Sequence, residues 1–139
     1  MKTSFNYQKP AISDVLAPYL KITISDPFEG NKIEVNALLD TGFDGEILIP
    51  IKIYEDLNLQ AFEFSQDILS FAETASGERL ELLSASGAIT LSGINVTIIV
   101  IIDSHSHCQE VLIGRKFLES YNTSMKGQDA IVELEFLER

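Results

Sequence analysis

The sequence predicts a mainly β fold, an antiparallel barrel or sandwich with one or two short helices. Short apolar runs, several of which alternate with polar residues, recur along the chain, as is typical of strands. Clusters of Gly, Asp, Asn and Ser separate these runs at short intervals, as turns between strands do. Hydrophobic residues make up 45% of the 139 residues, which is enough for the core of one domain.

The first part of the chain contains an arm and a hairpin. Residues 1–19 have a mixed pattern with two prolines and predict an N-terminal arm. Residues 20–25 alternate with period two, and residues 33–39 alternate before becoming continuously apolar. A turn cluster separates the two runs, so they predict a hairpin whose second strand ends in the core.

A loop and a short helix follow this hairpin. Residues 40–45 contain two Gly and two Asp and predict a loop, after which residues 47–49 predict a short buried strand. Pro50 is well placed to open a helix over 51–57, because its φ angle is already fixed and the first turn needs no N–H from it.

The second half of the chain predicts further strands with little helix. A polar loop is expected over residues 103–109 and a short helix over 115–121. The runs with strand character are residues 68–72, 79–83, 88–91, 94–102, 111–113, 124–125 and 131–136.

Composition excludes several classes of partner. The formal net charge of −11 and the pI of about 4.4 disfavour binding to nucleic acids and to anionic membranes. Cys108 is the only cysteine, so no disulfide forms within the chain, which fits a reducing compartment. Residues 1–10 lack an apolar signal core, and no apolar run is long enough to span a bilayer. A cytoplasmic protein is therefore expected.

The tripeptide Asp40-Thr41-Gly42 is the most informative motif. It follows a buried apolar strand, where a carboxylate is costly unless it is hydrogen-bonded or partly protonated. A glycine beside it lets backbone N–H groups approach the carboxylate. The alternative is an ordinary turn, since this tripeptide occurs by chance in a few per cent or so of chains of this length.

A calcium-binding loop competes for the same residues. Asp40, Asp44 and Gly45 match the first, fifth and sixth positions of an EF-hand. The third position is Gly42, the twelfth is Ile51 rather than Glu, and the flanks are strand-like rather than helical. The calcium loop is therefore rejected.

A second motif comes late in the chain. The run Val111-Leu112-Ile113 ends at Gly114 and describes a buried strand that turns sharply into the short helix opened by Arg115. Alone, this pattern is compatible with any strand–turn–helix connection.

Together the two motifs resemble the retropepsins, the single-domain aspartic peptidases of retroviruses and their cellular relatives. The likeness is closer to small bacterial members, which carry a loop like Asp40 to Gly45, and it covers roughly residues 20–125. The resemblance implies a closed antiparallel β barrel, a single domain over residues 1–139, and no metal or other cofactor.

The resemblance also implies roles in the first loop. Asp40 is expected to be the catalytic carboxylate, and Gly42 to donate its N–H to that carboxylate. Thr41 is expected to hydrogen-bond across a dimer axis. Asp44 is expected to meet the substrate backbone, and Phe43 to line the cleft.

Further roles fall on a flap and on the late motif. Ile113 and Gly114, with Arg115, are expected to brace the active loop from behind. Lys116 departs from the family pattern, which often has Asn or Asp there, so the resemblance does not extend to the usual hydrogen bonding of the short helix. The expected flap tip, which closes over the peptide, is Thr74, Ala75, Ser76 and Gly77.

The chain has one Asp-Thr-Gly and is too short for a second lobe, so a carboxylate dyad requires a homodimer. The predicted function is an aspartic endopeptidase that hydrolyses a peptide or protein substrate. The alternative is a non-catalytic dimeric peptide-binding or scaffold module with the same fold. Either the strand over residues 131–136 or the arm over 1–19 could build the dimer interface.

His105, His107 and Cys108 raise the possibility of a metal site or a Cys–His nucleophile. They lie in one polar loop, and zinc would need more ligands at fitting spacing. A solvated loop is the favoured interpretation.

Overall fold

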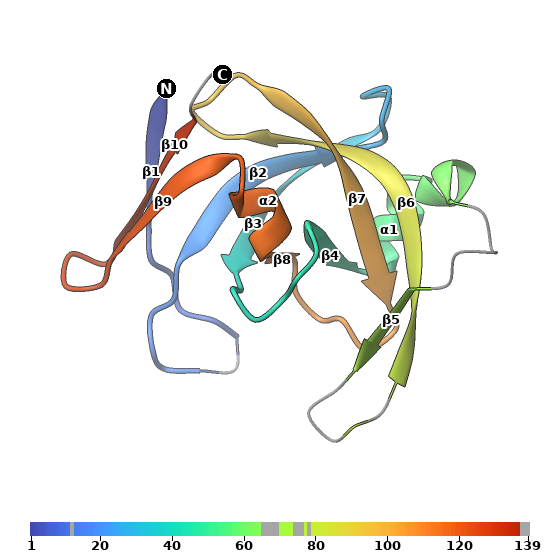
Figure 1. The fold of residues 1–139 in the computed structure, drawn as a ribbon, viewed down its shortest axis with the longest axis horizontal. Helices are drawn as coiled ribbons and strands as arrows, with labels where there is room; N and C mark the ends of the chain where they lie inside the picture. The colour runs from blue at the N-terminus through green and yellow to red at the C-terminus, as the bar shows by residue number, and fades with distance from the viewer. Residues whose placement is uncertain (12, 65–69, 74–76, 78, 137–139) are drawn as a thin grey trace.

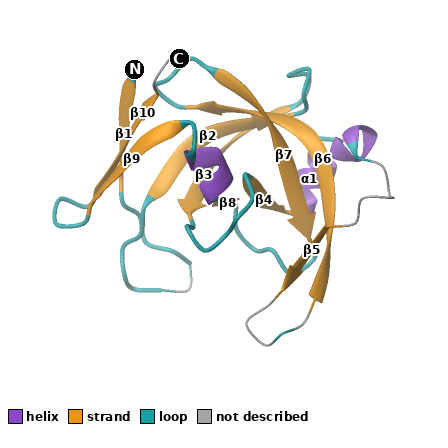
Figure 2. Ribbon diagram, viewed as in Figure 1, coloured by secondary structure: helices purple, strands orange, loops and turns teal. Residues whose placement is uncertain are grey.

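In the computed structural model the strands form two sheets (Figures 1 and 2). The structure describes residues 1–11, 13–64, 70–73, 77 and 79–136. The larger sheet has the order β2-β3-β8-β4-β7-β6-β5, and the smaller one β1-β10-β9. The strands are β1 (Lys2–Asn6), β2 (Tyr19–Ser25), β3 (Lys32–Leu39), β4 (Ile47–Pro50), β5 (Ser70–Glu73), β6 (Arg79–Leu91), β7 (Thr97–His105), β8 (Leu112–Ile113), β9 (Tyr121–Lys126) and β10 (Ile131–Phe136).

The predicted mainly β barrel is confirmed. An additional pairing of β2 with β6 closes the first six strands of the larger sheet on themselves, while β5 extends β6 away from the barrel. Most neighbours are antiparallel, but β3 pairs with β8, and β4 with β7, in parallel. The pairing of β3 with β8 places the ends of these two strands side by side, and the loop from Asp40 to Gly45 begins directly after β3.

The hairpin of β2 and β3 is confirmed, and its turn is held by a buried aspartate. The register runs from Tyr19 opposite Leu38 to Ser25 opposite Lys32. In the turn, the Asp26 carboxylate accepts the N–H groups of Phe28, Gly30 and Asn31 at 2.8, 3.2 and 2.7 Å. The bond from Asn31 has the largest effect, and together these bonds stabilise the charged form and lower the pKa of Asp26.

The prediction of separate strands over 79–83 and 88–91 is wrong, because β6 is one continuous strand. Ser84 to Gly87 have turn-like composition, yet they pair with β7 in unbroken register from Leu83 opposite Ser104 to Thr90 opposite Thr97. Gly87 suits the strand because a Cβ there would lie 2.1 Å from Ile102 Cδ1 and 2.9 Å from the Ser25 carbonyl oxygen. Tertiary pairing thus overrides local turn preference.

The bounds of the next strand also differ from the prediction. The turn at Ser92 and Gly93 is present, with Gly93 at a φ of +86°. However, β7 begins at Thr97 rather than at residue 94, and it continues through His105 into the predicted polar loop. The extension is possible because β4 pairs beside it up to the contact of Pro50 with His105.

The predicted N-terminal arm contains a strand. Residues Lys2 to Asn6 form β1, which pairs antiparallel with β10, and an isolated bridge joins Gln8 to Ala17. The strand β10 therefore lies between β1 and β9 within one chain (Figure 1).

Two short α-helices are present, as predicted. The first, α1 (Ile51–Asp56), starts directly after Pro50, and the second, α2 (Arg115–Leu118), is shorter than expected because Tyr121 already begins β9. A 3-10 turn, η1 (Leu59–Phe62), follows α1. The barrel encloses a core rich in Ile and Leu, into which Tyr54 of α1 and Phe117 of α2 also pack. Among the described residues, no helix is both long enough and apolar enough to span a bilayer.

Candidate active site

Asp40 lies at the end of β3, in a loop that the backbone holds in place. Its N–H donates to the carbonyl oxygen of Ile113 at 2.8 Å, which ties the loop to β8. The Gly42 N–H donates to Asp40 Oδ1 at 2.9 Å, and the Phe43 N–H donates to the Asp40 carbonyl oxygen at 3.2 Å. The carboxylate is thus oriented by a turn of its own loop, and Thr41 and Gly42 remain exposed.

Gly114 lies directly behind this loop. Its N–H donates to the Glu46 carbonyl oxygen at 3.0 Å, and the next N–H, of Arg115, donates to the Phe43 carbonyl oxygen at 2.9 Å. A Cβ at Gly114 would lie 2.1 Å from the Gly45 carbonyl oxygen and 2.7 Å from that of Phe43. Only a residue without a side chain permits this close approach of two backbone segments.

The next two side chains of the loop are held by different neighbours. The half-buried Phe43 ring packs against Gly45 and Gly114. The carboxylate of Asp44, whose side chain is 82% exposed, pairs with the Arg115 guanidinium. The structure therefore brings the loop that contains Asp40, Gly42, Phe43 and Asp44 together with the late motif around Gly114.

Two acidic residues that the sequence analysis did not single out lie against the same loop. Glu46 accepts the backbone N–H of Ile101 through Oε2, which links the end of the loop to β7. Asp103, on β7, is only 8% exposed and accepts the Ser84 hydroxyl at 2.6 Å. A Cβ on Gly45 would lie 3.2 Å from Asp103 Oδ2, so this carboxyl group lies against the loop.

Comparison with known proteins supports the fold. No family model matches the chain, and no curated protein matches it. Among solved structures, the chain is similar to EIAV protease complexed with the inhibitor HBY-793, with 16% sequence identity and a TM-score of 0.50. The match covers 81% of this chain and 92% of that chain. The fold is retropepsin-like. Since the identity is low, the likeness establishes the fold and leaves the chemistry to be argued from the residues.

The segment that corresponds to the expected flap is a hairpin that extends from the retropepsin-like barrel. In it β5 pairs with the start of β6, from Ser70 opposite Leu82 to Glu73 opposite Arg79. Of the expected tip residues, Gly77 is exposed with a φ of +85°, a conformation that favours glycine. Thr74, Ala75 and Ser76 lie outside the described residues, and so do residues 68 and 69 of the predicted strand.

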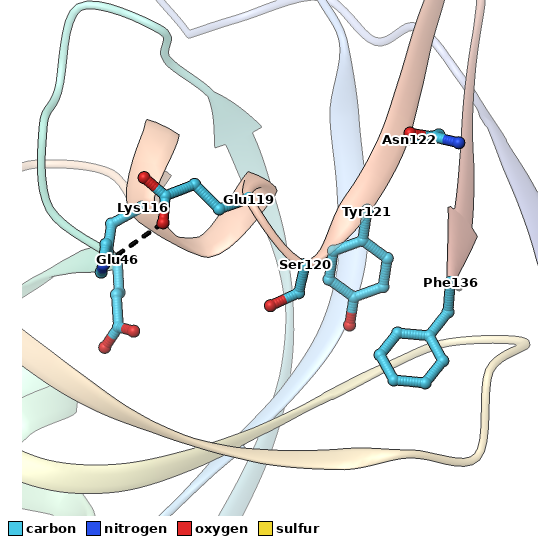
Figure 3. Close-up of a pocket in the computed structure, with 7 residues that line it drawn as sticks. All are labelled: Glu46, Lys116, Glu119, Ser120, Tyr121, Asn122 and Phe136. Atoms are coloured by element: carbon cyan, nitrogen blue, oxygen red, sulfur yellow. Dashed lines mark hydrogen bonds and ion pairs between the residues drawn. The ribbon is translucent and has the colours of Figure 1, made fainter. Parts of the chain in front are cut away.

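A cavity of about 640 Å³ lies beside α2, and Glu46, which directly follows the Asp40 loop, is among its lining residues. Figure 3 shows the rings of Tyr121 and Phe136 side by side, with the Glu46 carboxylate across the opening from them. At its rim Lys116 Nζ pairs with Glu119 at 3.2 Å, while the Lys116 N–H donates to the Gly45 carbonyl oxygen. The backbone N–H of Lys116 thus supports the Asp40 loop at Gly45, while the Lys116 side chain pairs with Glu119.

The segment with the two histidines is partly strand and partly loop. His105 ends β7, and the His107 N–H donates to His105 Nδ1 at 3.0 Å. Burial is the main cause that raises the pKa of Cys108. The thiol also donates a hydrogen bond to the Glu110 carbonyl oxygen, so the side chain is held in its thiol form. That state disfavours a Cys–His nucleophile. Within the part of the chain that the structure describes, no three His, Cys, Asp or Glu side chains are placed to hold a metal ion.

The buried carboxyl group of Asp103 predicts a pH dependence of stability. Burial, mainly, and the nearby Glu46 raise the pKa of Asp103, while the Ser84 hydroxyl opposes the shift. A folded-state pKa above the unfolded value favours folding at low pH, so this group reduces stability as pH rises from about 4 through its raised pKa. In Asp103→Asn this loss of stability should be absent. Its size in the wild type is about 1.4 kcal/mol for each unit by which the folded-state pKa of Asp103 exceeds the unfolded value.

Urea unfolding of the wild type and of Asp103→Asn at several pH values between about 4 and 7 checks this prediction. The free energy of unfolding of the variant should improve relative to that of the wild type as pH rises. Parallel curves for the two proteins would show that Asp103 does not titrate differently in the folded and unfolded states.

Proposed function

We propose that this chain is one half of a homodimeric aspartic endopeptidase, in which each copy supplies one Asp40. The observation that carries the proposal is a carboxylate at the end of β3, held by the Gly42 N–H in a retropepsin-like barrel. In this proposal the second carboxylate comes from a second copy, because residues 1–139 contain Asp-Thr-Gly only once. In this proposal residues 1–139 form a single retropepsin-like domain.

The chemistry follows from placing two carboxylates close together. Peptide hydrolysis needs a base to activate water and an acid to protonate the carbonyl oxygen and the leaving amine. Two carboxyl groups a few ångströms apart share one proton, because the second ionisation is opposed by the first charge. The ionised Asp40 then serves as the base, and the protonated Asp40 of the other copy serves as the acid.

The remaining loop residues have supporting roles in this proposal. Thr41 is exposed in the single chain, which suits a hydroxyl that bonds to the loop of the other copy. Asp44, fixed by Arg115, is positioned to meet the backbone of an extended peptide that adds as a strand. The Phe43 ring packs against Gly45 and Gly114, and in this proposal it lines the substrate cleft. The flap role of Thr74 to Gly77 stays a prediction, because Thr74, Ala75 and Ser76 lie outside the described residues.

The test is cleavage of a diverse peptide pool by the purified dimer between about pH 4 and 7, where a dyad with one shared proton is active. Defined cleavage products, separated by mass spectrometry, are the expected result. A dimer that binds peptides from the pool without cutting them would instead establish the non-catalytic peptide-binding module.

A further inference from the structure

The segment between β1 and β2 is a well-braced loop. Residues 8–17 are closed by a pair of backbone hydrogen bonds between Gln8 and Ala17, at 2.9 and 2.8 Å. On the side of the loop that leads to Ala17, the Val15 N–H donates to the Ser13 hydroxyl oxygen at 3.1 Å. This segment, hereafter the N-terminal loop, is therefore held together at its base, next to Leu16.

The N-terminal loop is attached to the strand that carries the active loop. The Leu39 N–H, one residue before Asp40, donates to the carbonyl oxygen of Pro18 at 3.0 Å. Leu16 is only two residues before Pro18, and so its Cα lies within about 7 Å of the Pro18 Cα. In Figure 1 both loops project towards the bottom of the view, on the side to which β5 and the start of β6 also extend.

The two residues directly before Ala17, at the base of the N-terminal loop, are apolar and exposed. Val15 is 74% exposed and Leu16 is 51% exposed, and covering either side chain costs little conformational entropy. Two adjacent large aliphatic side chains held out on a braced loop are typical of a contact surface rather than of scattered surface residues.

The charge of this region suits a meeting of two copies. Each copy carries a net charge of −11, so most pairs of faces repel one another. Within the N-terminal loop the only charged residues are Lys9 and Asp14, which form an ion pair at 3.2 Å and cancel each other. Two copies can therefore approach here with less repulsion than an average surface would cause.

We propose that Val15 and Leu16 form part of the face through which two copies of this chain associate, beside their Asp40 loops. The inference rests on the proposed function, which requires the two Asp40 loops to meet at a two-fold axis. Because Pro18, which directly follows the N-terminal loop, accepts the N–H of the residue before Asp40, the loop is carried towards that axis with the Asp40 loop. The partner that covers Val15 and Leu16 is thus the second copy.

The test is the dimer dissociation constant, measured by sedimentation, of the wild type and of Leu16→Asp. The matched control is Ile99→Asp on β7, an aliphatic residue of similar exposure, 59%, whose change adds the same charge. Leu16→Asp should weaken dimerisation at least about tenfold, and Ile99→Asp should leave it unchanged. Leu16→Ser should weaken it by a smaller factor, and all three variants should melt as folded proteins, since both positions are exposed.

A Leu16→Asp variant that dimerises as tightly as the wild type, or an Ile99→Asp variant that is weakened as much, would overturn the inference. Its failure is distinguishable from failure of the proposed function. If the wild type cleaves peptides and Leu16→Asp remains a cleaving dimer, the peptidase stands and this interface fails. If the wild type is a dimer that cuts no peptide and Leu16→Asp is a monomer, the interface stands and the peptidase fails.

Discussion

Replacing Asp40 by Asn should abolish peptide cleavage while leaving the fold and the dimer intact. The amide oxygen of Asn can still accept the Gly42 N–H, which lies 2.9 Å from Asp40 Oδ1 in the wild type. The amide neither loses nor gains a proton near neutral pH, so neither the base nor the acid of the dyad remains. We expect the cleavage rate to fall by a factor on the order of 10² to 10⁴ or more, measured on a substrate taken from the peptide pool.

Asp56→Asn is a matched control, because Asp56 is an exposed aspartate of α1 that pairs with Lys52 at 3.3 Å. Its cleavage rate should equal that of the wild type. An Asp40→Asn protein that cuts as fast as the wild type would place the activity at another site or in a contaminant.

Mixed dimers separate a shared site from an independent one. If both copies of Asp40 act in one dyad, a dimer with one Asn is inactive, and equal amounts of freely exchanging wild type and variant should keep about a quarter of the activity. An independent site in each copy would keep about half. The measurement is the initial rate after re-equilibration at constant total protein.

Replacing Gly114 by Ala should both destabilise the protein and displace the active loop. The new Cβ would lie 2.1 Å from the Gly45 carbonyl oxygen, 2.6 Å from Phe43 Cδ2 and 2.7 Å from the Phe43 carbonyl oxygen. Two of these atoms belong to the backbone and cannot rotate away, so the loop that carries Asp40 must shift. We expect a loss of about 2–3 kcal/mol in the free energy of unfolding.

The loss of activity should exceed what unfolding explains, because a displacement of about 1 Å at reacting groups costs on the order of 100-fold in rate. Urea unfolding and the cleavage rate of the folded fraction give the two effects separately. Gly127→Ala is the control: among the described residues, no heavy atom lies within 4 Å of the position its new methyl group would take, so both quantities should stay near wild type. Equal behaviour of the two alanine variants would show that Gly114 has no special role behind the loop.

Local patterns were sufficient where a strand is half buried and bounded by turn residues. The alternation over residues 20–25 and 33–39 predicted the hairpin of β2 and β3, because each side chain's face follows from the period of the strand. The same reasoning failed at Ser84 to Gly87, where small residues suggested a turn. Their pairing with β7 keeps them extended, and pairing with a distant strand leaves no mark in local composition.

The residues of the candidate site also fall into those that the sequence could identify and those that only the folded barrel brings together. The Asp40 loop could be found from the sequence because its residues are contiguous and follow an apolar strand. Glu46, Ser84 and Asp103 could not, since they come from a loop, β6 and β7 and meet only when the barrel closes. A weak signal existed at Asp103, which directly follows the buried Ile102 at the end of an apolar run.

By itself the sequence determined the β character of this protein, the hairpin that leads into Asp40 and the position of a carboxylate beside a glycine. Those features depend on residues that are neighbours along the chain. Only the tertiary structure decided that the barrel closes between β2 and β6, that β10 lies between β1 and β9, and that Asp103 lies against the Asp40 loop. Each of these depends on contacts between residues far apart in the sequence, whose geometry is settled by packing and backbone hydrogen bonding across the whole fold.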